Sequence, residues 1–223
     1  MRAADSVGAR CFFLLLGLSV LLPIPSSAQT EPTAQQVAQR VDKYYNGLHS
    51  LRTTFTESFR GMGIDRQESG VLLLRKPGKM HWSYTNPAGK VFLLDGKYAW
   101  FYSPGDAQVW RVSASQLDDL RSPLRFLLGH TQLQKELDGL TLSTTEAGLE
   151  LSGVPKGMQN RVEKIVLGVS ADGIIHSMVI NETDGAQTAF TFKESQPDVP
   201  APDTDFVFHP PPGVPVLDGL PPV

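Results

Sequence analysis

Residues 91–102 read VFLLDGKYAWFY, and this stretch decides the fold class. Two apolar runs flank the pair Asp95-Gly96, and a two-residue Asp-Gly turn accepts the positive backbone angles that twisted antiparallel strands require. The stretch therefore predicts a β-hairpin. The turns on either side, NPAG at 86–89 and PGDA at 104–107, are equally short, so neighbouring strands are expected to form an antiparallel meander.

Segments with period-two patterning continue outward from this hairpin in both directions, and turn residues separate them. They predict one mainly β domain, a curved antiparallel sheet with some α-helix. Besides the hairpin, the predicted strands are 51–60, 69–75, 79–85, 108–113, 139–145, 148–154, 161–170, 173–181, 186–195 and a short FVF strand at 206–208.

Two parts of the sequence have helical patterning instead. Residues 33–48 place apolar side chains at helical spacing, with Thr33 as the expected N-cap and Gly47 near the end. Residues 115–130 predict one or two short helices, because Pro123 suits a first helical turn and the leucines after it can share a face. Both segments are available to cover one face of the sheet.

The runs VLLL at 71–74 and VFLL at 91–94 are apolar on both faces of their strands. A sheet with one side in water tolerates this poorly, so something is expected to cover the second side. One explanation is an ordinary core beneath the two helices. The other is a concave apolar face that holds a hydrophobic ligand. Composition does not choose between them.

The N-terminus predicts export. Arg2 and Arg10 precede an apolar run at 11–22, and Ser26 and Ala28 supply the small residues that a signal peptidase needs. The run is shorter than the about 20 residues of a spanning helix, so residues 1–28 are expected to be a cleaved signal peptide.

The mature part, residues 29–223, is expected to be a single domain with a proline-rich link at 197–205 and a tail at 209–223. The one cysteine of the chain, Cys11, leaves with the signal peptide, so neither a disulfide nor a lipid anchor is expected. Removing Arg2, Asp5 and Arg10 changes the net charge from −3 to −4, which argues against nucleic acid as a partner and against strong attraction to anionic lipid head groups. No later segment is long and apolar enough to span a membrane, so stable membrane insertion is not expected.

No motif for catalysis stands out. The five histidines lie in separate elements without metal-ligand spacing, and no nucleophile elbow or phosphate-binding glycine loop is present. The adjacent Asp118 and Asp119 suit a solvated first helical turn. We expect no catalytic residue, no metal, no cofactor and no enzymatic activity.

The order of these segments resembles a known family. The motifs TTFTES at 53–58, SGVLLLRKPGKMHWSY at 69–84, VFLLDGKYAWFYSPGDAQV at 91–109 and RSPLRFLLG at 121–129 are similar to the periplasmic outer-membrane lipoprotein carrier proteins of the LolA family. The most specific parts are KPGKMHW and DGKYAWFY. The likeness extends to the ending FVFHPPPGVPV at 206–216.

The resemblance implies an incomplete barrel of about eleven strands whose concave face is covered by lid helices. It also implies a function: a monomeric periplasmic carrier takes acylated lipoproteins from an inner-membrane ABC transporter, shields their acyl chains, and passes them to an outer-membrane acceptor.

In the family, an arginine before the proline of the KPGKMHW strand binds backbone carbonyls of the lid and stabilises the lipid-free form. Lys76 stands there in this chain and lacks the planar fork of arginine. We expect Lys76 to form a weaker latch, or Arg75 or Arg125 to share it, with a solvated charge as the alternative.

Alternation and the resemblance together suggest which side chains meet the acyl chains, although each could equally belong to an ordinary core. The cavity candidates are Phe55, Phe59, Met80, Trp82, Phe92, Leu94, Trp100 and Tyr102, and the lid candidates are Leu124, Leu127 and Leu128.

Other functions remain open for such a fold. A general periplasmic lipid-binding protein or an envelope-stress sensor would use a similar domain, but the sensors carry a second domain that we do not expect in a chain of this length. The outer-membrane acceptor is similar but lipidated. An exported lipid-active enzyme would need polar residues inside the cavity. A passive binding protein would recognise a partner through a sheet edge.

Overall fold

The computed structural model describes residues 31–116, 132–146 and 148–221. The chain divides into the units Met1–Glu31 and Pro32–Val223, and all the secondary structure below belongs to the second unit. The predicted signal peptide and most of the predicted helical segment at 115–130 lie outside the described residues.

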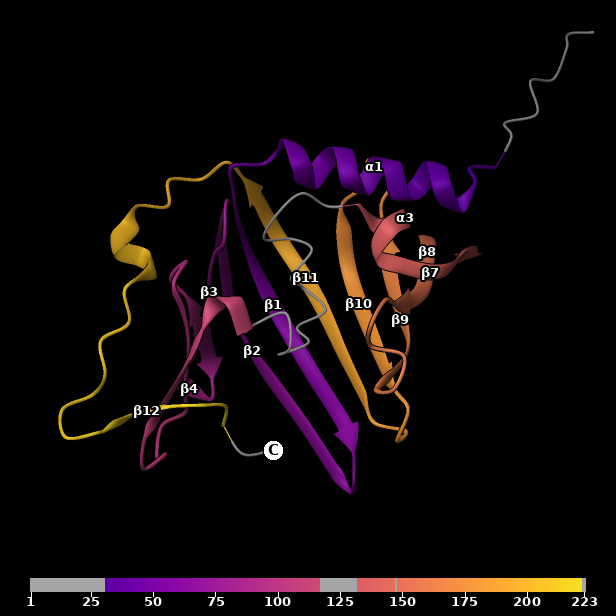
Figure 1. The fold of residues 1–223 in the computed structure, drawn as a ribbon. Helices are drawn as coiled ribbons and strands as arrows, with labels where there is room; N and C mark the ends of the chain where they lie inside the picture. The colour runs from indigo at the N-terminus through magenta and orange to yellow at the C-terminus, as the bar shows by residue number, and fades with distance from the viewer. Residues whose placement is uncertain (1–30, 117–131, 147, 222–223) are drawn as a thin grey trace, which may run out of the picture. The chain divides into compact units, whose positions relative to one another are not determined.

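Twelve strands of the described part form one open sheet in the order β12-β6-β5-β4-β3-β2-β1-β11-β10-β9-β8-β7 (Figure 1). The predicted β-rich, half-barrel fold class is confirmed. The strands are β1 Ser50–Gly61, β2 Ile64–Arg75, β3 Lys79–Asn86, β4 Ala88–Leu94, β5 Tyr98–Tyr102, β6 Val109–Ser113, β7 Leu137–Thr145, β8 Gly148–Pro155, β9 Val162–Val169, β10 Ile175–Glu182, β11 Gln187–Pro197 and β12 Val216–Asp218.

The sheet joins two meanders. Strands β1 to β6 follow one another, strands β7 to β11 do the same, and β11 pairs with β1 to connect the two groups. All of these pairs are antiparallel, whereas β12 lies parallel to β6. Strand β12 falls within the predicted tail, and it makes the count one larger than the resemblance implies.

Helix α1, Ala34–Gly47, begins at the predicted N-cap. The Thr33 hydroxyl accepts a hydrogen bond from the backbone N–H of Gln36, whose side chain accepts one from the N–H of Thr33. The apolar stripe of α1 is buried, and in Figure 1 the helix runs above the end of β10 and above α3, and the chain after it leads into β1. The short helix α3, Leu133–Glu136, packs beside it.

The two faces of the sheet are defined here by what they contact. The inner face packs against the buried side of α1 and contains the hydrophobic core. The outer face of β2 to β5 is covered by a C-terminal strap, residues Asp198–Phe208, which contains the 3₁₀ helix η3, Asp203–Phe206. A second 3₁₀ helix, η1 at Ala114–Gln116, follows β6.

The strap provides the expected cover for the second face of the sheet, and it shows that the expected strand at 206–208 is wrong. The runs at 71–74 and 91–94 indicate a cover on both faces, and the strap is the second cover. The expected FVF strand at 206–208 is wrong, because Phe206 ends a 3₁₀ helix and buries its ring to 1% exposure against the sheet. This segment is therefore held on the sheet by the buried Phe206 side chain and not by backbone hydrogen bonds of a strand.

Candidate functional site

Aromatic side chains gather on the inner face of β1 to β5 and β11. Residues directly opposite one another in an antiparallel pair project from the same face. Phe55 is opposite Phe192, Trp82 is opposite Phe92, and Phe92 is in turn opposite Phe101. This aromatic half of the inner face consists of Phe55, Phe59, Trp82, Tyr84, Phe92, Phe101, Phe190 and Phe192.

The rings of the aromatic half contact one another at close range. The ring centroids of Phe55 and Trp82 are 4.5 Å apart with the planes at 68°, and those of Phe92 and Phe101 are 4.9 Å apart. The Trp82 indole, 4% exposed, donates a hydrogen bond from Nε1 to Sδ of Met80 at 2.9 Å. Its polar atom is therefore satisfied inside an apolar surface.

Part of this surface stays accessible. Phe59, Phe92, Phe101 and Phe190 are only half-buried, although Phe55 and Trp82 are buried. The inner face of β8 to β10 behaves differently, because most of its aliphatic side chains are buried and only Leu149, at one end of β8, is half-buried. The aromatic half is thus the part of the inner face that an apolar ligand can contact.

A polar group lies at the tip end of the aromatic half, where Glu57 on β1 is directly opposite Glu68 on β2. Glu57 accepts a hydrogen bond from the Tyr84 hydroxyl at 3.0 Å, and Glu68, 5% exposed, forms an ion pair with Lys90. Arg66 adds a second ion pair to Glu68, at 3.3 Å. Burial raises the pKa of Glu57, and the Tyr84 hydrogen bond and nearby Lys90 oppose that shift.

Lys76, the expected latch residue, reaches α1. Its Nζ donates a hydrogen bond to the backbone carbonyl of Tyr45, in the last turn of the helix, at 2.5 Å. The Tyr45 carbonyl also accepts the N–H of Leu48 at 3.3 Å, and a cation is favoured beside the partial negative charge at the end of a helix. Burial lowers the pKa of Lys76.

Arg75 contacts the strap and not α1. Its Nη1 donates to the carbonyl of Ala201 at 2.7 Å, and its Nη2 pairs with the carboxylate of Asp203. Arg75 therefore does not share the hydrogen bond of Lys76. Arg125 lies outside the described residues, as do the lid candidates Leu124, Leu127 and Leu128.

Six of the eight cavity candidates lie on the inner face: Phe55, Phe59, Met80, Trp82, Phe92 and Leu94. Trp100 and Tyr102 do not, because the register pairs Leu93 with Trp100 and Val91 with Tyr102, which places both on the outer face. There the Trp100 ring stacks on Phe208 of the strap, with centroids 5.4 Å apart. The expectation that these two side chains line the cavity is therefore wrong.

Several inner-face residues were not among the predicted cavity residues. Phe101 is one residue from Trp100 and faces the other way, and Phe190 and Phe192 have the period-two spacing that marks a common face. That spacing is visible in the sequence. Glu57 and Glu68 carry no comparable signal, because their proximity follows from the register of β1 and β2.

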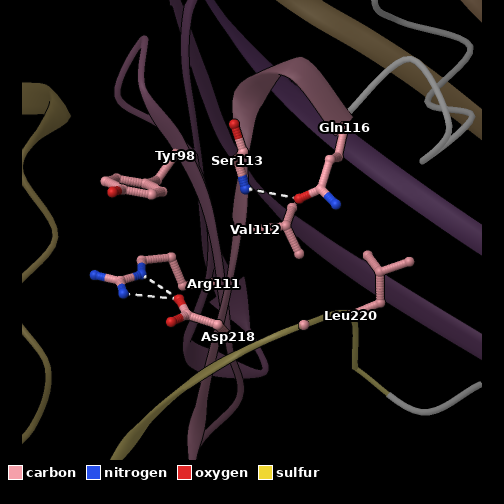
Figure 2. A pocket seen from close by; sticks show the side chains of 8 residues that line it. Tyr98, Arg111, Val112, Ser113, Gln116, Asp218 and Leu220 are labelled. Atoms are coloured by element: carbon pink, nitrogen blue, oxygen red, sulfur yellow. Dashed lines mark hydrogen bonds and ion pairs between the residues drawn. The ribbon is translucent and has the colours of Figure 1, made fainter.

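A pocket of about 630 Å³ lies where β6 meets the chain after β12 (Figure 2). Arg111 crosses it, pairing with Asp218 through Nε at 2.8 Å and Nη2 at 2.7 Å and lying 4.6 Å from the centroid of the Tyr98 ring. Gln116 and Leu220 also line it. Its charged groups satisfy each other, and it shares no side chain with the aromatic half.

The described residues contain no helix long and apolar enough to cross a membrane. Within the same ranges, no three His, Cys, Asp or Glu side chains are grouped so that they could hold a metal ion.

Comparison with known proteins gives one family. A family model described as "Outer membrane lipoprotein carrier protein LolA" matches residues 47–209. The outer-membrane lipoprotein carrier protein of Nitrosomonas europaea is 26% identical over 93% of this chain and 98% of its own length. That of Chromobacterium violaceum is 27% identical with the same coverage of both chains.

A solved structure supports the fold. It is an uncharacterised conserved protein from Thermus thermophilus, with a TM-score of 0.52 and 14% sequence identity over 83% of this chain and 99% of that one. At this identity the likeness concerns the fold alone.

Proposed function

The chain belongs to the LolA family of outer membrane lipoprotein carrier proteins, and on that premise we propose that it carries lipoproteins by binding their acyl chains on the aromatic half of the inner face. The observation that supports this most is the partial exposure of Phe92, Phe101 and Phe190 beside an aliphatic core in which most side chains are buried. Apolar side chains that remain accessible within a core are suited to a ligand that completes the packing.

A carrier must also release what it binds. Burial of an acyl chain is worth about 0.8 kcal/mol per methylene, so a rigid open pocket would hold a lipid too tightly. A closed state that competes with the ligand solves this problem. The Lys76 hydrogen bond to Tyr45 supports such a state, because it ties α1 to the turn between β2 and β3. In this proposal Lys76 is the latch.

The proposed route begins with removal of residues 1–28 and release of a monomer into the periplasm. An inner-membrane ABC transporter then delivers the acylated lipoprotein, and an outer-membrane acceptor takes it. The family membership supports this sequence of partners. The proposed carrier needs no cofactor, because cargo is transferred by exchange between apolar surfaces.

The polar group at Glu57 and Glu68 is the feature that a lipid-active enzyme could use. Its charges are matched internally, since Glu57 accepts from Tyr84 and Glu68 pairs with Lys90 and Arg66. This matching suits a group that closes the end of the aromatic half. We therefore favour binding over catalysis, and fatty-acid release from bound cargo would contradict that choice.

Native mass spectrometry of the protein isolated from its own periplasm tests the proposal. A copurified acylated polypeptide is the expected ligand. Phospholipid in its place would indicate a general lipid shuttle, and repeated absence of ligand would contradict the carrier function.

Two neighbouring residues on β4 provide matched variants. Phe92→Asp places a charge on the aromatic half, and we expect it to abolish copurification of the cargo. Val91→Asp makes the same change on the outer face, so cargo should be retained. Equal loss in both variants would show that the aromatic half is not the binding surface.

A further inference from the structure

The turn after β2 touches both covers of the sheet. Arg75 is the last residue of β2 and Lys76 is the first residue of the turn that follows, and their side chains reach opposite faces of the sheet. Lys76 reaches Tyr45 of α1, which covers the inner face, whereas Arg75 binds Ala201 and Asp203 of the strap, which covers the outer face. One short stretch of backbone therefore connects the latch to the strap.

Backbone hydrogen bonds tie the same segments together. The N–H of Lys76 donates to the carbonyl of His49, between α1 and β1, at 2.8 Å. The N–H of His49 donates to Oδ1 of Asp198, at the start of the strap, and the N–H of Asp198 donates to the carbonyl of Ser50, both at 2.8 Å. The latch turn, the end of α1 and the strap thus meet at one junction.

The strap itself is firmly attached near this junction. Phe206 is 1% exposed, and the Arg75 guanidinium carbon lies 5.2 Å from the centroid of its ring. The carboxylate of Asp203 accepts hydrogen bonds from both Arg75 and Lys79. Nδ1 of His81 lies 2.9 Å from the carbonyl oxygen of Asp205.

We infer that Arg75 and Asp203 are positioning residues for the Lys76 latch, so that the strap on the outer face controls how firmly α1 is held on the inner face. The inference rests on the proposed function of Lys76. A lysine has a flexible stem and a single charged point, so its hydrogen bond depends on where the backbone places its Cα. Arg75, held by the strap, fixes that backbone one residue away.

A consequence follows for exchange of cargo. Anything that pulls the strap from Arg75 loosens the latch and frees the end of α1, without contacting the cargo surface. A partner that binds the outer face could therefore change the affinity for acyl chains on the opposite side of the sheet.

Stopped-flow uptake of dansyl-undecanoic acid by the full chain tests this coupling. Asp203→Asn removes the charge that holds Arg75, on a side chain that is 76% exposed, so the fold should persist. We expect this substitution to raise the uptake rate at least about threefold when Lys76 is present, and to have a much smaller effect in a Lys76→Met background.

Asp65→Asn is the matched control, because it makes the same change in an exposed ion pair with Arg60 at the end of the β1–β2 hairpin. It should leave the uptake rate unchanged in both backgrounds. If Asp203→Asn has equal effects with and without Lys76, or none, the strap does not position the latch and the inference is overturned.

Amide hydrogen exchange separates this failure from failure of the proposed function. If no variant takes up the probe, acyl-chain binding is contradicted, while the coupling can still be measured at the N–H groups of Lys76 and Leu48, which donate to His49 and Tyr45. Faster exchange at these two amides in Asp203→Asn supports the inference. Unchanged protection overturns it.

Discussion

The two halves of the inner face differ in both composition and burial. The aliphatic half, on β8 to β10, contains Leu151, Leu167 and Met178, each with no measurable exposure. The aromatic half, on β1 to β5 and β11, leaves Phe92 and Phe101 half-buried and ends in the Glu57 polar group. Both halves belong to one sheet and contribute to one hydrophobic core cluster.

The difference separates stability from binding. Complete burial of aliphatic side chains against α1 and α3 yields the packing energy that keeps the sheet folded. Large rings that are only partly covered contribute less to folding, but they present apolar area to a ligand. The molecule thus uses one half of a continuous surface as core and keeps the other available.

The largest expected effect is the difference in stability between two variants, each of which truncates one residue in one half. Leu167→Ala leaves a cavity in the aliphatic half and should lower the free energy of unfolding by about 2–5 kcal/mol. Phe101→Ala removes a half-buried ring and should cost less. Denaturant titration measures both changes.

We expect the opposite ranking of the two variants when uptake of an acyl probe is measured and normalised to the folded fraction. Phe101→Ala should reduce uptake, and Leu167→Ala should not. If both variants lose stability and uptake in the same proportion, the two halves act as a single core and the distinction between them is wrong.

The sequence predicts much of this arrangement but not which faces meet. The hairpin at 91–102 is confirmed, although the N–H of Asp95 donates to the carbonyl of Tyr98, which makes Gly96 and Lys97 the two turn residues. Any two-residue turn pairs even-numbered with odd-numbered residues, so Phe92 shares a face with the odd-numbered residues of β5, among them Phe101. The length of the turn alone therefore places Trp100 and Tyr102 on the face opposite to that of Phe92.

Other features depend on contacts between distant segments and have no local signal. The proline-rich link predicts that the strand before it ends near residue 197, as β11 does. The position of the Phe206 ring beneath Arg75, in contrast, depends on how β2 and β3 lie in the folded sheet. Similarly, the pairing of β12 with β6 joins segments about a hundred residues apart. Patterning within one strand cannot predict either contact.

A glycine in the turn between β9 and β10 tests how α1 is seated on the aliphatic half. Gly173 has a φ of +87°, and a Cβ there would lie 2.5 Å from the backbone carbonyl of Arg40 in α1. Gly173→Ala should therefore cost the strain of a left-handed residue, about 1–3 kcal/mol, and in addition displace the helix. Thermal unfolding measures the loss.

Gly185→Ala is the control, because Gly185 has a similar φ of +89° and open space around it. The loss of stability in Gly185→Ala should therefore reflect the backbone strain alone. A larger loss for Gly173→Ala, together with faster uptake of the acyl probe, would show that α1 rests on the aliphatic half. Equal losses would contradict close contact with the helix.

The smallest expected effect is a pH dependence that belongs to the aromatic half. Burial raises the pKa of Glu57 above its usual value of 4.5, so the folded state binds this proton more tightly than the unfolded state does. Stability should then fall as pH rises from about 4.5 through the folded pKa, and level off above it. Glu57→Gln keeps an acceptor for the Tyr84 hydroxyl and should remove that part of the pH dependence.

Unfolding by denaturant at several pH values, in wild type and Glu57→Gln, measures this difference, with Glu163→Gln at an exposed site on β9 as control. The wild type should lose stability relative to Glu57→Gln as pH rises, because only the wild type must ionise a carboxyl group away from water. An identical pH dependence would mean that water reaches Glu57 freely. The aromatic half would then be open at that end, and the polar group could not act as its closure.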